Sequence, residues 1–245
     1  MNSKNTTNQD FRNIADRWHD AHKFSPAPRH RRRIIFNIIK RLTFTSCLDV
    51  GCAQGYLLEA LAKRGKSIFG CDISNEIVRT NRMHFPCAEF EEVDVSKETY
   101  PSGKCFDLVI ASEVLEHIQD WQLATKYLTT MSKRYILITA PTAKLHPIDR
   151  MIGHFQHYTL KDLKDELEKN SFRVIFYRYW GIPLHALYKY LINLFYYEKI
   201  YDAFALKRYG IKEKLISQFL YYLFYVNDIF NAGSQLFILA EKYNK

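Results

Sequence analysis

The chain has 245 residues, 47% of them hydrophobic, so it can bury one substantial core within the length of a single α/β domain. Its formal net charge of +9 would suit an anionic partner. Five cysteines without a CxxC pair argue against a disulfide framework and a zinc site, and favour a reducing, cytoplasmic location. The polar opening MNSKNTTNQD lacks the apolar region of a secretory signal, and the apolar stretch 215–226 is too short to span a membrane.

Residues 1–25 are expected to form a polar tail and an N-terminal helix. The one dense basic run follows at residues 29–33, which read RHRRR. We interpret this run as the solvated face of a helix, because a short basic run is weak evidence of a site. The alternative is a patch that binds an anion.

From residue 46 onward, short β-rich runs alternate with helical patterns, which is typical of βαβ units and a mainly parallel sheet. Helix ends are marked by Gly65, by Ser74 and Thr159 as N-caps, by Pro86 and by Asn170. Strands are expected at residues 47–50, 68–71, 90–93, 108–111, 135–139, 172–179 and 235–240, and helices at 56–64, from 74 to before 86, 120–131 and 159–170.

Residues 181–232 differ from the rest, because aromatic residues crowd there at spacings closer to helical than to alternating. They are expected to form a helical insertion between a core at 26–180 and a last strand within 233–245. The insertion could be a lid over an acceptor, a dimer surface, or an amphipathic element on a membrane surface with Lys207, Arg208, Lys212 and Lys214 on its polar side. Packing in the core remains the simplest use of most of the rings.

The segment LDVGCAQG at residues 48–55 ends a predicted strand and opens a helix. Gly51 and Gly55 let the backbone turn sharply and approach a ligand closely. The helix N-terminus offers unpaired N–H groups to a carboxylate, and Asp49 can offset an ammonium group. An amino-acid moiety would satisfy both.

Two further acids follow the next predicted strands. Asp72 stands 23 positions after Asp49, near the spacing at which such folds place an acid on ribose hydroxyls. Asp94 could accept from an adenine amino group while Ile73 and Val95 pack on the base. The three acids thus predict contacts to an amino acid, a ribose and an adenine in turn.

The pattern Asp49-x-Gly51-x-Ala53-x-Gly55, the acids Asp72 and Asp94, and the segment FDLVIASEVLEH at 106–117 resemble the successive motifs of class I S-adenosylmethionine (SAM) dependent methyltransferases. Ala53 departs from the glycine more usual in that family and could narrow the pocket. The resemblance implies a Rossmann-like α/β fold with a seven-stranded sheet, and SAM as cofactor. The implied SAM-binding residues are Asp49, Gly51, Ala53, Gly55, Asp72, Ile73, Asp94, Val95 and Glu113.

A nicotinamide dinucleotide is the rival cofactor. Its fingerprint is GxGxxG, whereas this chain has GxAxG after an acid, and Asp49 would repel a pyrophosphate. SAM is therefore the better fit.

Candidate bases for an acceptor proton are His117, after the fourth predicted strand, and His154 and His157, after the fifth. The structural alternatives are that His117 belongs to a helix cap and that His157 holds a loop in place.

The spacing Glu113-x-x-Glu116-His117 is similar to the metal-binding ExxEH motif of ubiquinone-biosynthesis O-methyltransferases and small-RNA 2′-O-methyltransferases. These side chains could hold a divalent ion that lowers the pKa of a hydroxyl. The same letters also occur in relatives for which no metal is implied, so the sequence favours a site without metal.

The sequence as a whole predicts a methyltransferase that modifies a small molecule, a sugar or a lipid-linked acceptor, at oxygen. Membrane contact through 181–232 is an open expectation, a DNA partner is not expected, and no oligomeric state is predicted. An RNA methyltransferase is the alternative that the basic run supports, although no RNA-binding module is recognised. A catalytically silent SAM-binding module is the third reading.

Overall fold

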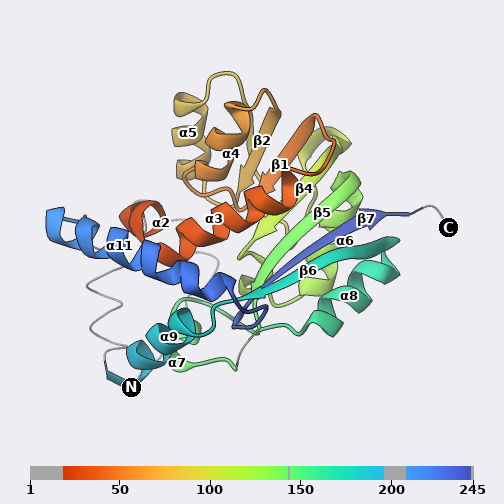
Figure 1. Ribbon diagram of the computed structural model, residues 1–245. Helices are drawn as coiled ribbons and strands as arrows, with labels where there is room; N and C mark the ends of the chain where they lie inside the picture. The colour runs from red at the N-terminus through yellow and green to blue at the C-terminus, as the bar shows by residue number, and fades with distance from the viewer. Residues whose placement is uncertain (1–18, 143, 196–207, 244–245) are drawn as a thin grey trace, which may run out of the picture.

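In the computed structural model, which describes residues 19–142, 144–195 and 208–243, seven strands form one sheet in the order β3-β2-β1-β4-β5-β7-β6 (Figure 1). β7 runs antiparallel between β5 and β6, and the other neighbours are parallel. The strands are β1 (Ser46–Val50), β2 (Ser67–Asp72), β3 (Glu89–Glu92), β4 (Phe106–Ser112), β5 (Ser132–Pro141), β6 (Phe172–Trp180) and β7 (Gln235–Lys242). The seven expected strands are confirmed, with ends that differ by at most three residues.

Helices cover both faces of the sheet, so that two hydrophobic cores lie on opposite sides of it (Figure 1). Strand β4 is buried without a break from Leu108 to Ala111, as expected of a strand enclosed on both faces. The helices are α2 (His19–Phe24), α3 (Pro26–Ile39), α4 (Tyr56–Ala62), α5 (Asn75–His84), α6 (Trp121–Met131), α7 (Pro147–Met151), α8 (Leu160–Lys169), α9 (Leu184–Phe195) and α11 (Ile211–Leu223). Short 3₁₀ segments are η1 (Pro101–Gly103), η2 (Leu115–His117) and η3 (Phe224–Asp228).

The helix ends follow the local signals in the sequence. The side chain of Ser74 accepts from the Ile77 N–H at the start of α5, and Thr159 forms a capping box with Asp162 at the start of α8. Asn170 is the C-cap residue of α8. These expected caps are confirmed.

The expected helical insertion before the last strand is also present, as α9, α11 and η3. These elements lie at one end of the molecule beside α2 and α3, away from α5 and α8 (Figure 1). Tyr196, Tyr197 and Lys207, which fall within the expected insertion at 181–232, lie outside the described residues. Among the described helices, none combines the length and the apolar character needed to cross a bilayer.

The basic run lies on α3, and the expectation of a solvated face is wrong. Arg29, Arg31, Arg32 and Arg33 are all half-buried. The Arg29 guanidinium donates to Gln218 and stands 3.8 Å from the centre of the Tyr221 ring, both on α11. Arg33 pairs with Asp228 of η3 at 2.6 Å. The run therefore joins the first helices to the insertion.

Candidate functional site

A cavity of about 630 Å³ opens at the carboxyl ends of the parallel strands, the edge at which such sheets bind ligands. Its lining comes from the turns after β1, β2 and β4 on one side and from α2, α3, α7 and α9 on the other. The predicted cofactor residues Asp49, Gly51, Ala53, Asp72, Ile73, Asp94, Val95 and Glu113 all line it. Gly55 does not, and serves instead as the N-cap residue of α4.

The turn after β1 adopts the left-handed backbone conformation that glycine permits, as expected from its sequence. Gly51 and Gly55 have φ of 68° and 70°, and a Cβ on Gly51 would come within 2.7 Å of the Val114 side chain. Ala53 also has a positive φ, 44°. Its N–H donates to Asp72 at 3.0 Å, and its carbonyl accepts from Asn81 at 2.7 Å. These two hydrogen bonds stabilise alanine in a conformation that favours glycine.

Asp49 and Asp72, at the tips of β1 and β2, give the cavity an acidic end. Both side chains are buried. Burial, and then the nearby Asp72 carboxylate, raise the pKa of Asp49 to about 8. Burial also raises the pKa of Asp72, although the N–H groups of Ser74 and Ala53 donate to it and oppose the rise. A cationic ligand would remove this penalty, because an opposite charge favours the ionised carboxylate.

Asp94 is held differently. Burial alone would raise its pKa, but hydrogen bonds from Lys97 and Ser96 bring the pKa of Asp94 below its usual value. Lys97 Nζ lies 2.8 Å from Asp94 Oδ2. Asp94 is thus an ionised acceptor at the apolar wall that Ile73 and Val95 contribute to the cavity.

Glu113, directly after β4, is engaged by three other elements. Its carboxylate pairs with Arg31 of α3 at 2.9 Å and accepts from Thr139 of β5 at 3.0 Å and from Gln235 of β7 at 2.6 Å. Charge-assisted bonds of this kind fix geometry. Glu113 therefore joins the sheet to α3 at the cavity wall.

Two of the three predicted bases, His117 and His154, line the cavity, and His157 stands behind them. His154 Nδ1 and His157 Nε2 are 3.0 Å apart, and His157 Nε2 is 3.8 Å from Asp149 Oδ2. Burial, followed by the neighbouring His117 and His157, lowers the pKa of His154 to about 2. The His154 imidazole is therefore neutral and a weak proton acceptor, but a ring nitrogen can accept a hydrogen bond or bind a metal ion.

Sequence reasoning missed Asp149 and Lys189, which form an ion pair of 3.0 Å at the wall of the cavity. The signal for Asp149 was its spacing from His146, because the two form a capping box at the start of α7. The insertion offered no comparable signal for Lys189, nor for His185 and Tyr188, which face the cavity from the same helix.

Glu116 is completely buried, and neither of its carboxylate oxygens has a hydrogen-bond partner among the described residues. Burial, and then Glu113, raise its pKa well above the usual value. One ligand atom each from Glu116, His117 and His154 lie within 4.8 Å of one another. Glu113, the third member of the metal set considered from the sequence, does not belong to this group. Asp149, His154 and His157 form a second group of the same size.

Comparisons with known proteins agree with this fold. Residues 18–176 match a family model described as a methyltransferase domain. The chain is 33% identical to a ubiquinone biosynthesis O-methyltransferase of Photorhabdus laumondii over 46% of this chain and 50% of that protein. It thus spans about half the length of the curated relatives it matches.

Solved structures share the fold over nearly the whole chain. One is the magnesium protoporphyrin IX methyltransferase of Synechocystis PCC 6803 with bound SAM, at a TM-score of 0.61 and 15% identity, covering 99% of this chain and 98% of that one. Another is the [4+2]-cyclase SpnF, at a TM-score of 0.65 and 14% identity, covering 98% and 97%. At these identities the likeness shows the fold alone.

Proposed function

Because the chain belongs to the methyltransferase-domain family, we propose that it transfers the methyl group of SAM to an oxygen atom of a small-molecule acceptor. The main support for this proposal is a single cavity with two chemically different ends. Asp49, Asp72 and Asp94 line one end, and His117, His154 and Lys189 line the other. A sulfonium donor suits the acidic end, which carries uncompensated negative charge when Asp49 ionises. Sugars and lipid-linked alcohols remain within this acceptor class.

In this proposal the donor lies along the acids. Asp49 faces the ammonium group of its methionine part, Asp72 accepts from the ribose hydroxyls, and Asp94 accepts from the adenine amino group. Methyl transfer from a sulfonium is an in-line displacement, so alignment of donor and acceptor supplies much of the rate, up to about 7–11 kcal/mol in favourable cases. The protein's task is chiefly to hold the two reactants in line.

The neutral His154 is the proposed hydrogen-bond acceptor that orients the acceptor's hydroxyl group toward the methyl carbon, with His157 as a positioning residue bonded to it at 3.0 Å. The hydroxyl proton leaves to water as the new C–O bond forms and the bond between the methyl carbon and sulfur breaks. Two arginines of the basic run that suggested RNA form ion pairs within the protein: Arg31 with Glu113 and Arg33 with Asp228. This pairing supports a small molecule over RNA.

The test begins with calorimetric titration of the protein with SAM, S-adenosylhomocysteine and NAD, followed by mass spectrometry of phenols and sugars incubated with enzyme and SAM. SAM and S-adenosylhomocysteine are expected to bind. Only with SAM is a product expected that is heavier than the acceptor by one CH₂, about 14 mass units. Preference for NAD would reject the proposal. Binding of SAM without turnover on any acceptor would favour the silent binding module instead.

His154→Gln is expected to lower kcat up to about 100-fold while the affinity for SAM stays the same, because a misplacement of the acceptor by about 1 Å can cost roughly 10²-fold in rate. The matched control is His84→Gln, at an exposed position at the end of α5. A full rate for His154→Gln would remove this residue from the mechanism.

The unpartnered carboxylate of Glu116 favours a second candidate, the same transfer assisted by a divalent cation. Glu116, His117 and His154 offer one carboxylate oxygen and two ring nitrogens at suitable separations. A cation held there would lower the pKa of an acceptor hydroxyl.

This candidate predicts that Mn²⁺ or Zn²⁺ raises the melting temperature of the protein and that Glu116→Gln abolishes the rise. Turnover should fall to background in excess chelator and return with added metal. The matched control is Glu98→Gln, at an exposed position. Full activity in excess chelator, with no thermal shift, would reject the cation.

A further inference from the structure

Helix α11 packs on the protein through its polar side and exposes its apolar side, the opposite of the usual arrangement in a globular protein. Ser217 is buried, and the half-buried Gln218 accepts from Arg29, so the polar side faces α3. The large apolar side chains point outward instead, with Leu215 65% and Phe219 66% exposed. Ile211, Ile216, Tyr222 and Leu223 are exposed on the same helix. A surface helix normally buries its apolar stripe against the protein. The exposed stripe of α11 therefore indicates a surface that binds a partner.

Helix α9 repeats the arrangement. Its residues Leu187, Tyr190, Leu191 and Leu194 are exposed at spacings of three and four, which place them along one side of the helix. The polar residues His185 and Lys189 line the cavity. The helix thus has the candidate site on one side and an exposed apolar stripe on another. Both helices lie outside residues 18–176, the part that matches the family model.

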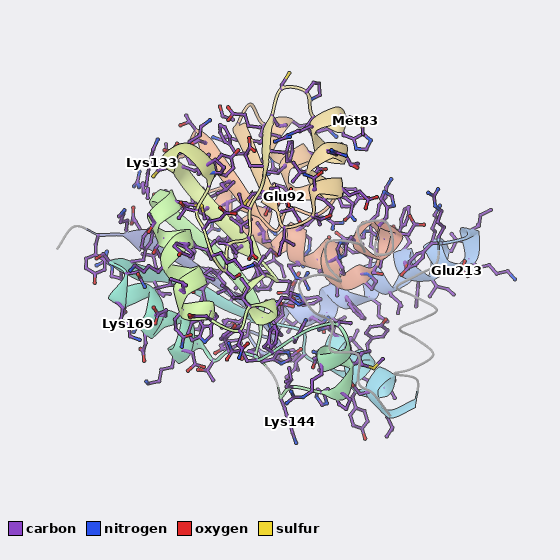
Figure 2. All side chains as sticks on the ribbon, turned by 180° about the vertical axis from the view of Figure 1, so that it is seen from behind. Met83, Glu92, Lys133, Lys144, Lys169 and Glu213 are labelled. Carbon is purple, nitrogen blue, oxygen red and sulfur yellow. The ribbon has the colours of Figure 1, made fainter. Side chains whose placement is uncertain are left out.

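Exposed apolar residues continue beyond α11, at Val226, Ile229 and Phe230. Helices α9 and α11 both pack against η3, so their exposed apolar residues belong to neighbouring elements. Apolar patches above a few hundred Å² usually mark an interaction surface. Figure 1 shows α9 and α11 at the same end of the molecule, where α11 projects beyond the sheet, and Figure 2 shows Glu213 near its outer end.

The charge on this surface selects the partner. Arg208, Lys212 and Lys214 are exposed, and Glu213 is the only acid in residues 208–223. Two copies of the chain joined by this surface would bring like charges together, whereas anionic lipid headgroups would attract them. Tyrosines such as Tyr190 and Tyr222 also suit a membrane–water interface, because the ring can contact the lipid chains while the hydroxyl stays in the hydrated headgroup region.

We propose that the exposed apolar sides of α9 and α11, called here the interfacial surface, insert into the headgroup region of an anionic bilayer, with Arg208 and Lys212 on the lipid phosphates. This mode of binding needs no spanning helix, because an amphipathic helix lies in the plane of the interface. It also places one side of the cavity wall next to the bilayer, so an acceptor that partitions into lipid has a short path to the site. The binding step does not depend on methyl transfer.

Vesicle flotation of the full chain tests the proposal. Binding to vesicles with 30% phosphatidylglycerol is expected at low salt, with at least about tenfold weaker binding to pure phosphatidylcholine and in 0.5 M salt, because surface charges are screened. The double variant Leu215→Gln/Phe219→Gln should weaken binding at least tenfold, and Lys212→Glu should weaken binding to the anionic vesicles alone.

The matched control is Met83→Gln. Met83 is 75% exposed on α5, an element outside the interfacial surface, and its replacement should leave vesicle binding unchanged. Thermal unfolding and SAM titration of every variant separate loss of membrane binding from loss of fold or donor site. Absence of wild-type binding to anionic vesicles, or equal binding by the double variant, would overturn the proposal. Sedimentation that showed a dimer dissociated by Leu215→Gln/Phe219→Gln would assign the surface to a second copy instead.

Discussion

Replacement of Asp72 by alanine is expected to weaken SAM binding by a factor of roughly 10² to 10⁴. Two hydrogen bonds from ribose hydroxyls to a carboxylate are worth about 1.5–3 kcal/mol each, and every 1.4 kcal/mol is about tenfold in affinity. The carboxylate has a second role, because it accepts from the N–H groups of Ala53 and Ser74. Its loss would also release the turn that contacts the donor.

Calorimetric titration of Asp72→Ala and Asp72→Asn separates these two roles. Asparagine keeps one acceptor oxygen and the volume of the side chain, so Asp72→Asn should bind SAM more weakly than the wild type and more tightly than Asp72→Ala. Asp165→Asn, on the surface of α8, is the matched control. If Asp72→Ala bound SAM as the wild type does while remaining folded, the assignment of the acidic end to the donor would fail.

The acidic end of the cavity could be predicted from sequence because its residues stand at the tips of consecutive strands. Parallel strands bring their carboxyl ends to one edge, so Asp49, Asp72 and Asp94 had to converge once the strands were recognised. The strand ends were less predictable. Strand β5 runs to Pro141 because β7 pairs with it antiparallel, Pro141 opposite Gln235, and that partner lies about a hundred residues later.

The other end of the cavity depends on contacts that no local pattern encodes. Whether Arg31 faces solvent or Glu113 is decided by what packs on α3, and the insertion that packs there begins some 150 residues further along. The same holds for Lys189, whose partner Asp149 lies on α7. Polar residues on a surface helix are expected to face solvent, whereas α11 turns its polar side toward α3 and its apolar side toward solvent. That His117 and His154 lie at this edge of the sheet was thus predictable, whereas the residues that pair around them were not.

Asp49→Asn is expected to stabilise the empty protein at pH 8 by a few kcal/mol, while it weakens SAM binding. The pKa of Asp49 is about 8 in the folded protein, against an ordinary value of 3.8 for an aspartate exposed to water. The folded state therefore binds this proton more tightly than the unfolded chain does between about pH 4 and 8. In that window the unfolding free energy of the wild type should fall by up to about 1.4 kcal/mol per pH unit from this group.

Asparagine cannot ionise, so urea unfolding of Asp49→Asn at pH 5 and pH 8 should show a much smaller fall than the wild type shows. In the wild type, SAM binding should release a proton below pH 8, since the cationic donor favours the ionised carboxylate, and the affinity should rise with pH between about 6 and 8. The variant should bind weakly with little pH dependence. Equal pH dependence of stability in both proteins would show that Asp49 is already ionised in the empty site. A carboxylate that is unfavourable without its ligand and favourable with it links donor recognition to the stability of the fold.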